Sequence, residues 1–190
     1  MREITVKVYA FAELSEAAKE RALTAFRDVN VEFNWWEGSY YTIRAAGELL
    51  GLEIGDIHFD TYLYCIFDAS YEYVRGAVKA IQAEFPHATD LHDVARKLQD
   101  LQKRHFYSLS CAVTEGRSMN RYRCFRFGED YECEELGDII DDFAHWARVL
   151  LRDEYEWLTS DEAVKEIIII NEYEFPNCIV TGKQIGRAHV

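Results

Sequence analysis

The chain has 190 residues, of which 49% are hydrophobic and 14% aromatic, and its formal net charge is −13. This length and apolar content are typical of one folded domain with a core, and they exclude an intrinsically disordered chain. No apolar run approaches the roughly 20 residues of a membrane span, and the first residues lack a signal-peptide pattern. We therefore expect a cytoplasmic protein that makes no membrane contact.

The charge is distributed unevenly along the sequence. Residues 129–174 contain 16 acidic and three basic residues, a balance equal to the net charge of the whole chain. Residues 96–126 contain eight basic residues and only two acidic ones. Such a distribution bears on solubility and on the sign of a partner's charge, and it does not indicate a reaction.

Hydrophobic periodicity and capping residues predict the elements of the N-terminal half. Residues 2–9 alternate β-branched and polar side chains, the pattern of a strand with one buried face. Ser15 is the expected N-cap of the first helix, and Leu14 ahead of it can pack against that helix. In order, we expect a strand over 2–9, helices over 15–28 and 33–50, a stop at Gly51, and strands over 52–59 and 62–73.

The rest of the chain, from residue 75 onward, is predicted to contain a hairpin and four helices. A hairpin loop centred between Arg117 and Ser118 would place Cys111 directly opposite Cys124. Thr159, with Glu162 three residues later, predicts a capping box for the last helix. In order, we expect helices over 75–85 and from Thr89 or Asp90 to 105, a hairpin over 107–127, a long helix from Glu134, and a last helix from Thr159.

This order predicts an α+β fold over residues 1–184: a single domain with an antiparallel or mixed sheet of about five strands covered by helices, and with acidic helices at its C-terminal end. We expect the strand over 2–9 to belong to the same sheet as the 107–127 hairpin. Residues 185–190 match the translation of a common sequencing adapter, which indicates a non-native tail from a metagenomic contig.

No motif in the sequence indicates a catalytic residue, a cofactor or a metal. The histidines lack metal-ligand spacing, no glycine-rich phosphate loop is present, and the serines fit no nucleophile signature. The five cysteines lack Cys-x-x-Cys spacing, so we interpret them as buried, reduced residues.

Five carboxylates are predicted to share one face of the long helix. They could form a solvated surface, a general acid–base or metal site, or a patch that binds a partner protein. An exposed helix face does not shift a carboxylate pKa as catalysis requires, which disfavours the second possibility. The residues are Glu134, Glu135, Asp138, Asp141 and Asp142.

The hairpin segment 117–126 interleaves arginines with aromatic residues. It could follow a nucleic-acid backbone while its rings stack on bases. Alternatively, its arginines could lie against the acidic helices of the same chain. A net charge of −13 disfavours direct nucleic-acid binding, so we favour the second interpretation.

Three further stretches carry a family resemblance: residues 8–22, the Asn34-Trp35-Trp36-Glu37 run, and residues 153–163 with 171–175. In these stretches the chain resembles small acidic proteins of tailed phages that are commonly labelled antitoxin of toxin–antitoxin stability system. The resemblance implies a phage origin, an infected bacterial host and a binding role, and it carries no catalytic motif.

The sequence therefore favours a non-enzymatic inhibitor. We expect it to neutralise a toxin, or a host immune effector such as a CRISPR nuclease complex, by presenting its acidic surface to a basic nucleic-acid-handling site. The expected aromatic anchors are the exposed members of a set of five residues, foremost Trp35, Trp36 and Trp157, with Tyr40 and Tyr41 as further candidates. The alternatives are an enzyme of unrecognised type acting on nucleotides or nucleic acid, and a protein that sequesters a small nucleotide.

Overall fold

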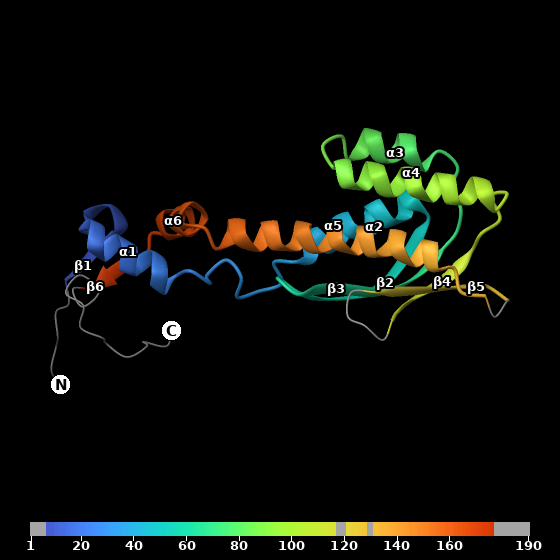
Figure 1. The fold of residues 1–190 in the computed structure, drawn as a ribbon. Coiled ribbons are helices and arrows are strands. Elements are labelled where there is room, and N and C mark those ends of the chain that lie inside the picture. Colours follow the sequence, from blue (N-terminus) through green and yellow to red (C-terminus); the bar gives the residue numbers. More distant parts are fainter. Residues whose placement is uncertain (1–6, 117–120, 129–130, 177–190) are drawn as a thin grey trace. The chain divides into compact units, whose positions relative to one another are not determined.

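The computed structural model describes residues 7–116, 121–128 and 131–176. Its elements confirm the α+β class (Figure 1). The chain divides into two compact units, which the expectation of one sheet in one domain did not anticipate. The first unit combines the residues up to Trp35 with those from Tyr155 onward, and the second runs from Trp36 to Glu154.

The second unit contains a four-stranded antiparallel sheet. Strands β2 and β3 are the two strands expected after Gly51, and β4 and β5 form the expected hairpin. Buried and exposed residues alternate along β3 and β5, as in a sheet with one covered face. In sheet order the strands are β2 (Leu52–Asp60), β3 (Tyr64–Tyr71), β4 (Cys111–Glu115) and β5 (Tyr122–Arg126).

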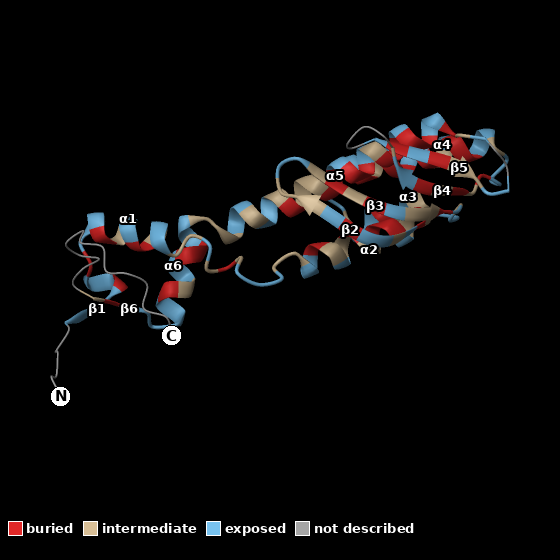
Figure 2. Ribbon diagram, turned by 90° about the horizontal axis from the view of Figure 1, so that it is seen from below, coloured by how far each residue is buried: buried red, intermediate tan, exposed pale blue. Residues whose placement is uncertain are grey.

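The helices of the second unit lie on one side of this sheet in Figure 1. Phe143 of the long helix packs edge-on against Phe67 of β3, with ring centroids 5.8 Å apart. Figure 2 marks such buried positions in red along the helices. The helices are α2 (Glu37–Leu50), α3 (Ala77–Glu84), α4 (Thr89–Arg104) and α5 (Glu134–Leu158), whose last turn belongs to the first unit.

Helix α2 ends as the sequence predicts. Gly51 has φ +88°, and a Cβ at this position would lie 1.9 Å from the carbonyl oxygen of Glu72. Only glycine therefore allows the chain to turn here directly from α2 into β2.

The predicted register of the hairpin is wrong by two residues. Cys111 lies opposite Arg126, and Cys124 lies opposite Val113. The reason is the loop, which is closed by a hydrogen bond from the Gly116 N–H to the Arg121 carbonyl oxygen, one residue further along than assumed. An even shift leaves every side chain on its expected face, so the two cysteines are diagonal neighbours. Residues 117–120 of this loop lie outside the described part.

The first unit contains a separate two-stranded sheet, so the expectation that the N-terminal strand joins the hairpin sheet is wrong. Tyr9 of β1 pairs with Phe175 of β6, because Phe175 is needed to cover Phe11 and Phe26, whose rings it contacts. Most of the predicted strand, residues 2–6, lies outside the described part. The elements are β1 (Val8–Ala10), η1 (Phe11–Glu13), α1 (Glu16–Ala25), α6 (Asp161–Ile170) and β6 (Glu174–Pro176).

Side chains from residues 27–30 connect α1 to the turn before α6. Arg27 donates a hydrogen bond to the Thr159 carbonyl oxygen at 2.9 Å and pairs with Asp161 at 2.7 Å. The N-cap of α6 is Ser160 rather than the predicted Thr159, since the Ser160 hydroxyl accepts the N–H of Ala163. Ser15 occupies the N-cap position of α1 as predicted, but its side chain makes no capping hydrogen bond.

No helix among the described residues is long and apolar enough to cross a bilayer. The adapter-like residues 185–190 lie outside the described part of the chain.

Candidate interaction surface

The five predicted carboxylates lie on the first half of α5, but they are not equally exposed. Glu134, Glu135, Asp138 and Asp142 are exposed, as an amphipathic helix with its apolar stripe on the core requires. The side chain of Asp141 is only 15% exposed, so its place in an exposed patch is a wrong prediction.

Helix α4 supplies cations to one side of this face. The ammonium of Lys97 lies 2.7 Å from the Asp142 carboxylate. The Arg104 guanidinium makes two hydrogen bonds to the Glu135 carboxylate, one of them 2.8 Å long. The basic residues that precede the acidic quarter of the sequence are thus used within the same unit.

The hairpin supplies cations to the other side. Arg121 lies 2.7 Å from Asp141 and 3.5 Å from Asp138. Arg123 makes two hydrogen bonds to Glu132, 2.8 and 2.6 Å long. For Arg121 the interpretation that the hairpin lies against an acidic helix of the same chain is therefore confirmed. Arg123 is also paired within the chain, but with Glu132 ahead of α5, and Arg117 lies outside the described residues.

Two of these ion pairs shift a pKa toward the charged form. The hydrogen bond from Arg104 lowers the pKa of Glu135, and the hydrogen bond to Asp142 raises the pKa of Lys97. Both shifts favour the ionised side chain at neutral pH. A general acid or base needs the opposite kind of shift, toward neutrality near the working pH.

Asp141 holds two elements together. One carboxylate oxygen accepts the backbone N–H of Tyr122 at 2.8 Å, and the other pairs with Arg121. The Tyr122 hydroxyl in turn accepts the N–H of Phe67 inside the core. Asp141 thus fixes the start of β5 against α5 and has a structural role.

Two open hollows flank α5. The hollow on the α4 side has a volume of about 420 Å³ and includes Lys97, Arg104 and Glu135 in its wall. The hollow on the hairpin side has a volume of about 300 Å³ and includes Arg121 and Arg148. The wall of each hollow contains both basic and acidic side chains. Such a wall suits contact with a protein surface better than the binding of a single small ion.

Of the three tryptophans predicted as anchors, the structure leaves one prominent at the surface. Trp35 is half-buried, and its ring centroid lies 5.6 Å from that of Tyr155. Trp36 is half-buried against Phe59, at 6.0 Å. Trp157 is 56% exposed.

The most exposed aromatic residue, Phe106, is one that the sequence pattern did not single out. Phe106 is 89% exposed, and it precedes Tyr107, whose ring packs on Tyr73 with centroids 4.9 Å apart. Both Phe106 and Tyr107 have positive φ, 53° and 59°. Positive φ in a bulky residue costs of order 1–3 kcal/mol, so the surrounding structure must enforce this turn.

The buried side chain of Gln102 supplies that enforcement. Its amide donates to the Leu109 carbonyl oxygen at 2.7 Å and to the Tyr71 hydroxyl at 3.2 Å, and it accepts the Leu109 N–H. The sequence does contain a signal for this unusual turn. The helix ends at Arg104 with no glycine to adopt the left-handed conformation, and two aromatic residues follow in its place.

Arg104 connects the turn that carries Phe106 and Tyr107 to the acidic face of α5. Arg104, two residues before Phe106, is the residue that binds the Glu135 carboxylate. We call Glu134, Glu135, Asp138, Asp142, Phe106 and Tyr107 the α5 surface.

No group of three or more His, Cys, Asp or Glu side chains in the described part of the chain is placed to hold a metal ion. Among known proteins, residues 64–161, just over half of the chain, match the family model of DUF8835, a domain of unknown function. No match was found among curated proteins or solved structures.

Proposed function

This chain belongs to the DUF8835 family, and we propose that it is a non-enzymatic binding protein that inhibits a partner protein with a basic surface. The α5 surface makes the contact. Its carboxylates attract the partner, and Phe106 with Tyr107 provides the apolar anchor. The target class is a nucleic-acid-handling protein, because such proteins expose basic grooves.

The exposure of Phe106, two residues after the arginine that pairs with Glu135, carries the proposal. Aromatic side chains dominate the binding energy of protein interfaces. A backbone turn that is fixed before binding loses less entropy when its residues bind a partner. The Gln102 hydrogen bonds to Leu109 fix this turn from inside the unit.

The ion pairs on α5 do not prevent such a contact. Those of Glu135, Asp138 and Asp142 lie at the surface, where a pair contributes about 0–1 kcal/mol and is easily exchanged for a partner's cation. The sequence of the second unit has 22 acidic against 13 basic residues, so an acidic excess remains after the internal pairs form.

The phage origin rests on the family resemblance of residues 8–22, 34–37, 153–163 and 171–175, and the cytoplasmic site of action rests on the sequence pattern of the chain. On that basis the targets are a toxin or a host immune effector, and the protein acts as an antitoxin-like or counter-defence inhibitor.

Affinity capture from a lysate of phage-infected bacteria, followed by mass spectrometry, tests the proposal. We expect one dominant basic protein that handles nucleic acid. The Phe106→Ala variant should lose this protein. Phe33→Ala is the matched control, since Phe33 is also a strongly exposed phenylalanine, at 68%, and lies in the first unit. Equal capture by the wild type and both variants would contradict the assignment of the α5 surface.

A further inference from the structure

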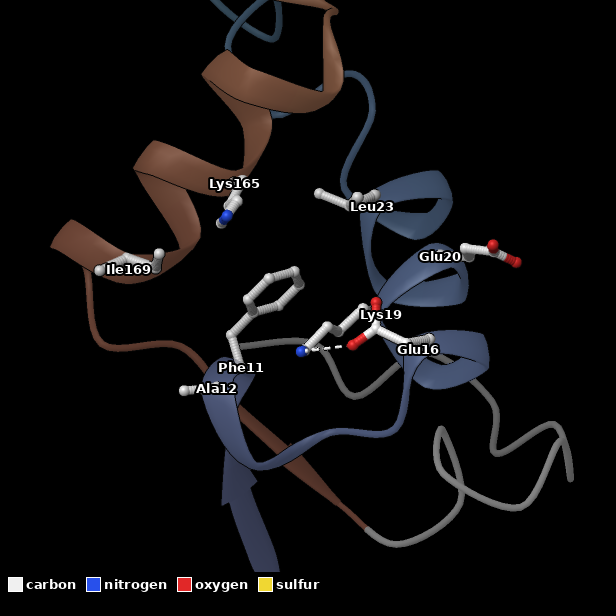
Figure 3. A pocket seen from close by; sticks show the side chains of 8 residues that line it. All are labelled: Phe11, Ala12, Glu16, Lys19, Glu20, Leu23, Lys165 and Ile169. Atoms are coloured by element: carbon white, nitrogen blue, oxygen red, sulfur yellow. Dashed lines mark hydrogen bonds and ion pairs between the residues drawn. The ribbon is translucent and has the colours of Figure 1, made fainter.

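A hollow of about 390 Å³ lies between α1 and α6 in the first unit (Figure 3). Its walls are mostly apolar. Phe11 forms the floor, with Leu23 on the α1 side and Ile169 on the α6 side. Ile169 is 54% exposed, so this wall is open to a ligand. The volume lies within the range of about 300–1,000 Å³ that is usual for small-molecule sites.

Two lysines enter this hollow. Figure 3 shows the side chains of Lys19 and Lys165 directed into the space between the helices. Lys19 is paired with Glu16 at 2.8 Å. The pKa of Glu16 is lowered first by the Lys19 hydrogen bond and more weakly by the charge of Lys165. Within the described part of the chain, Lys165 makes no hydrogen bond or ion pair of its own.

We propose that this hollow binds an amphipathic monoanion, a molecule with an apolar body and one carboxylate or similar group. The apolar body rests on Phe11, Leu23 and Ile169. The anionic group pairs with Lys165, which has the free charge, and lies within reach of Lys19. This site does not rest on the proposed function of the α5 surface.

The rim charges restrict the ligand further. Glu16 stands on the α1 side of the hollow and pairs with Lys19, while Figure 3 shows the Glu20 carboxylate directed away from the hollow. A polyanion such as a nucleoside triphosphate would meet the Glu16 carboxylate and only one cation that is not already paired, Lys165. A single negative charge can reach Lys165 while its apolar body stays on the floor, which also distinguishes the site from a nucleotide pocket.

Decanoate is the probe, and its binding to the full-length protein is measured by isothermal titration calorimetry. We expect binding that weakens about tenfold or more in Lys165→Gln and survives in Lys165→Arg. Neutral decanol should bind at least about tenfold more weakly than decanoate, because it lacks the charge that Lys165 holds.

Two adjacent isoleucines provide a matched control. Ile169 lines the hollow, whereas Ile170 is 65% exposed and does not line it. Ile169→Glu should abolish decanoate binding and Ile170→Glu should preserve it, with circular dichroism confirming that both variants are folded. The proposal would be overturned if decanoate binding were undetectable at about 1 mM. It would also be overturned if Lys165→Gln and Ile169→Glu bound decanoate as tightly as the wild type does.

Discussion

Asp141 accepts the backbone N–H of Tyr122 at 2.8 Å, and through this bond a carboxylate of α5 fixes the first residue of β5. Asp138, one turn earlier on the same helix, is 72% exposed and reaches Arg121 only at 3.5 Å. Two aspartates that look equivalent in the sequence therefore have different roles. One supports the fold, and the other remains available to a partner.

The first prediction follows from this contrast. Asp141→Ala should lower the free energy of unfolding by about 1–3 kcal/mol, because it leaves a partly buried N–H without its charged acceptor. Asp138→Ala should leave the free energy of unfolding nearly unchanged, since it removes only an exposed contact. Urea unfolding with an unchanged m-value measures both. Equal effects of the two substitutions would show that Asp141 does not hold β5 in place.

The elements could largely be predicted from the sequence, because periodicity and capping are local. The stop at Gly51 and the cap position at Ser15 depend on the residues next to them, and both are observed. The sheet that contains β1 could not be predicted. It depends on Phe175, a residue far along the chain, and no local pattern relates Phe175 to Tyr9.

The candidate site was only partly predictable for a similar reason. Helical spacing placed the carboxylates on one face correctly, apart from Asp141. It could not show that Lys97 and Arg104 lie alongside them, because that depends on how α4 packs. Phe106 was missed because its exposure results from a left-handed turn that Gln102 enforces through tertiary hydrogen bonds.

The second prediction concerns Gln102. Gln102→Ala should lower the free energy of unfolding by about 2–4 kcal/mol, because the Leu109 N–H and carbonyl lose their partner in a buried environment. Gln99→Ala, one turn earlier on α4, is the control and should change the free energy of unfolding by less than about 0.5 kcal/mol. Hydrogen exchange at Leu109 should also accelerate in Gln102→Ala. Unchanged exchange there would show that the side chain does not hold the turn.

The third prediction concerns the thiols. Burial raises the pKa of Cys111 to about 11 and that of Cys65 to about 12. A shift from 9 to 11 leaves about 100-fold less thiolate at pH 8, so Cys111 should react with iodoacetamide about 100-fold more slowly than a free thiol. Because the folded-state pKa is raised, each thiol favours the folded state fully below about pH 9. That contribution to stability is lost as the pH rises toward 11 for Cys111 and toward 12 for Cys65.

Thiol counting completes the test of the cysteines. Cys65, Cys111, Cys124 and Cys133 are free thiols in the structure. Denatured, non-reduced protein should therefore yield five thiols, counting Cys178, which lies outside the described residues. A count of three would mean that a disulfide forms after all.

The last prediction tests the α5 surface by kinetics. The variant carries Glu134→Gln, Glu135→Gln, Asp138→Asn and Asp142→Asn. It keeps Asp141, which fixes the start of β5, although the sequence alone placed Asp141 with the other four carboxylates. Association with the captured partner should slow about tenfold, and its dependence on salt should flatten, because surface charges act mainly on the rate of encounter.

A second quadruple variant separates local charge from net charge. Glu48, Asp56, Asp68 and Glu72 are exposed carboxylates of the same unit, away from α5. Replacing them with Gln or Asn changes the net charge by the same amount, so long-range attraction falls equally in both variants. The control should slow association less than about threefold, since steering depends on charges near the contact. Stopped-flow measurements at low salt decide the matter. If both variants slow association equally, the rate depends on the net charge of the chain alone, and α5 is not the contact surface.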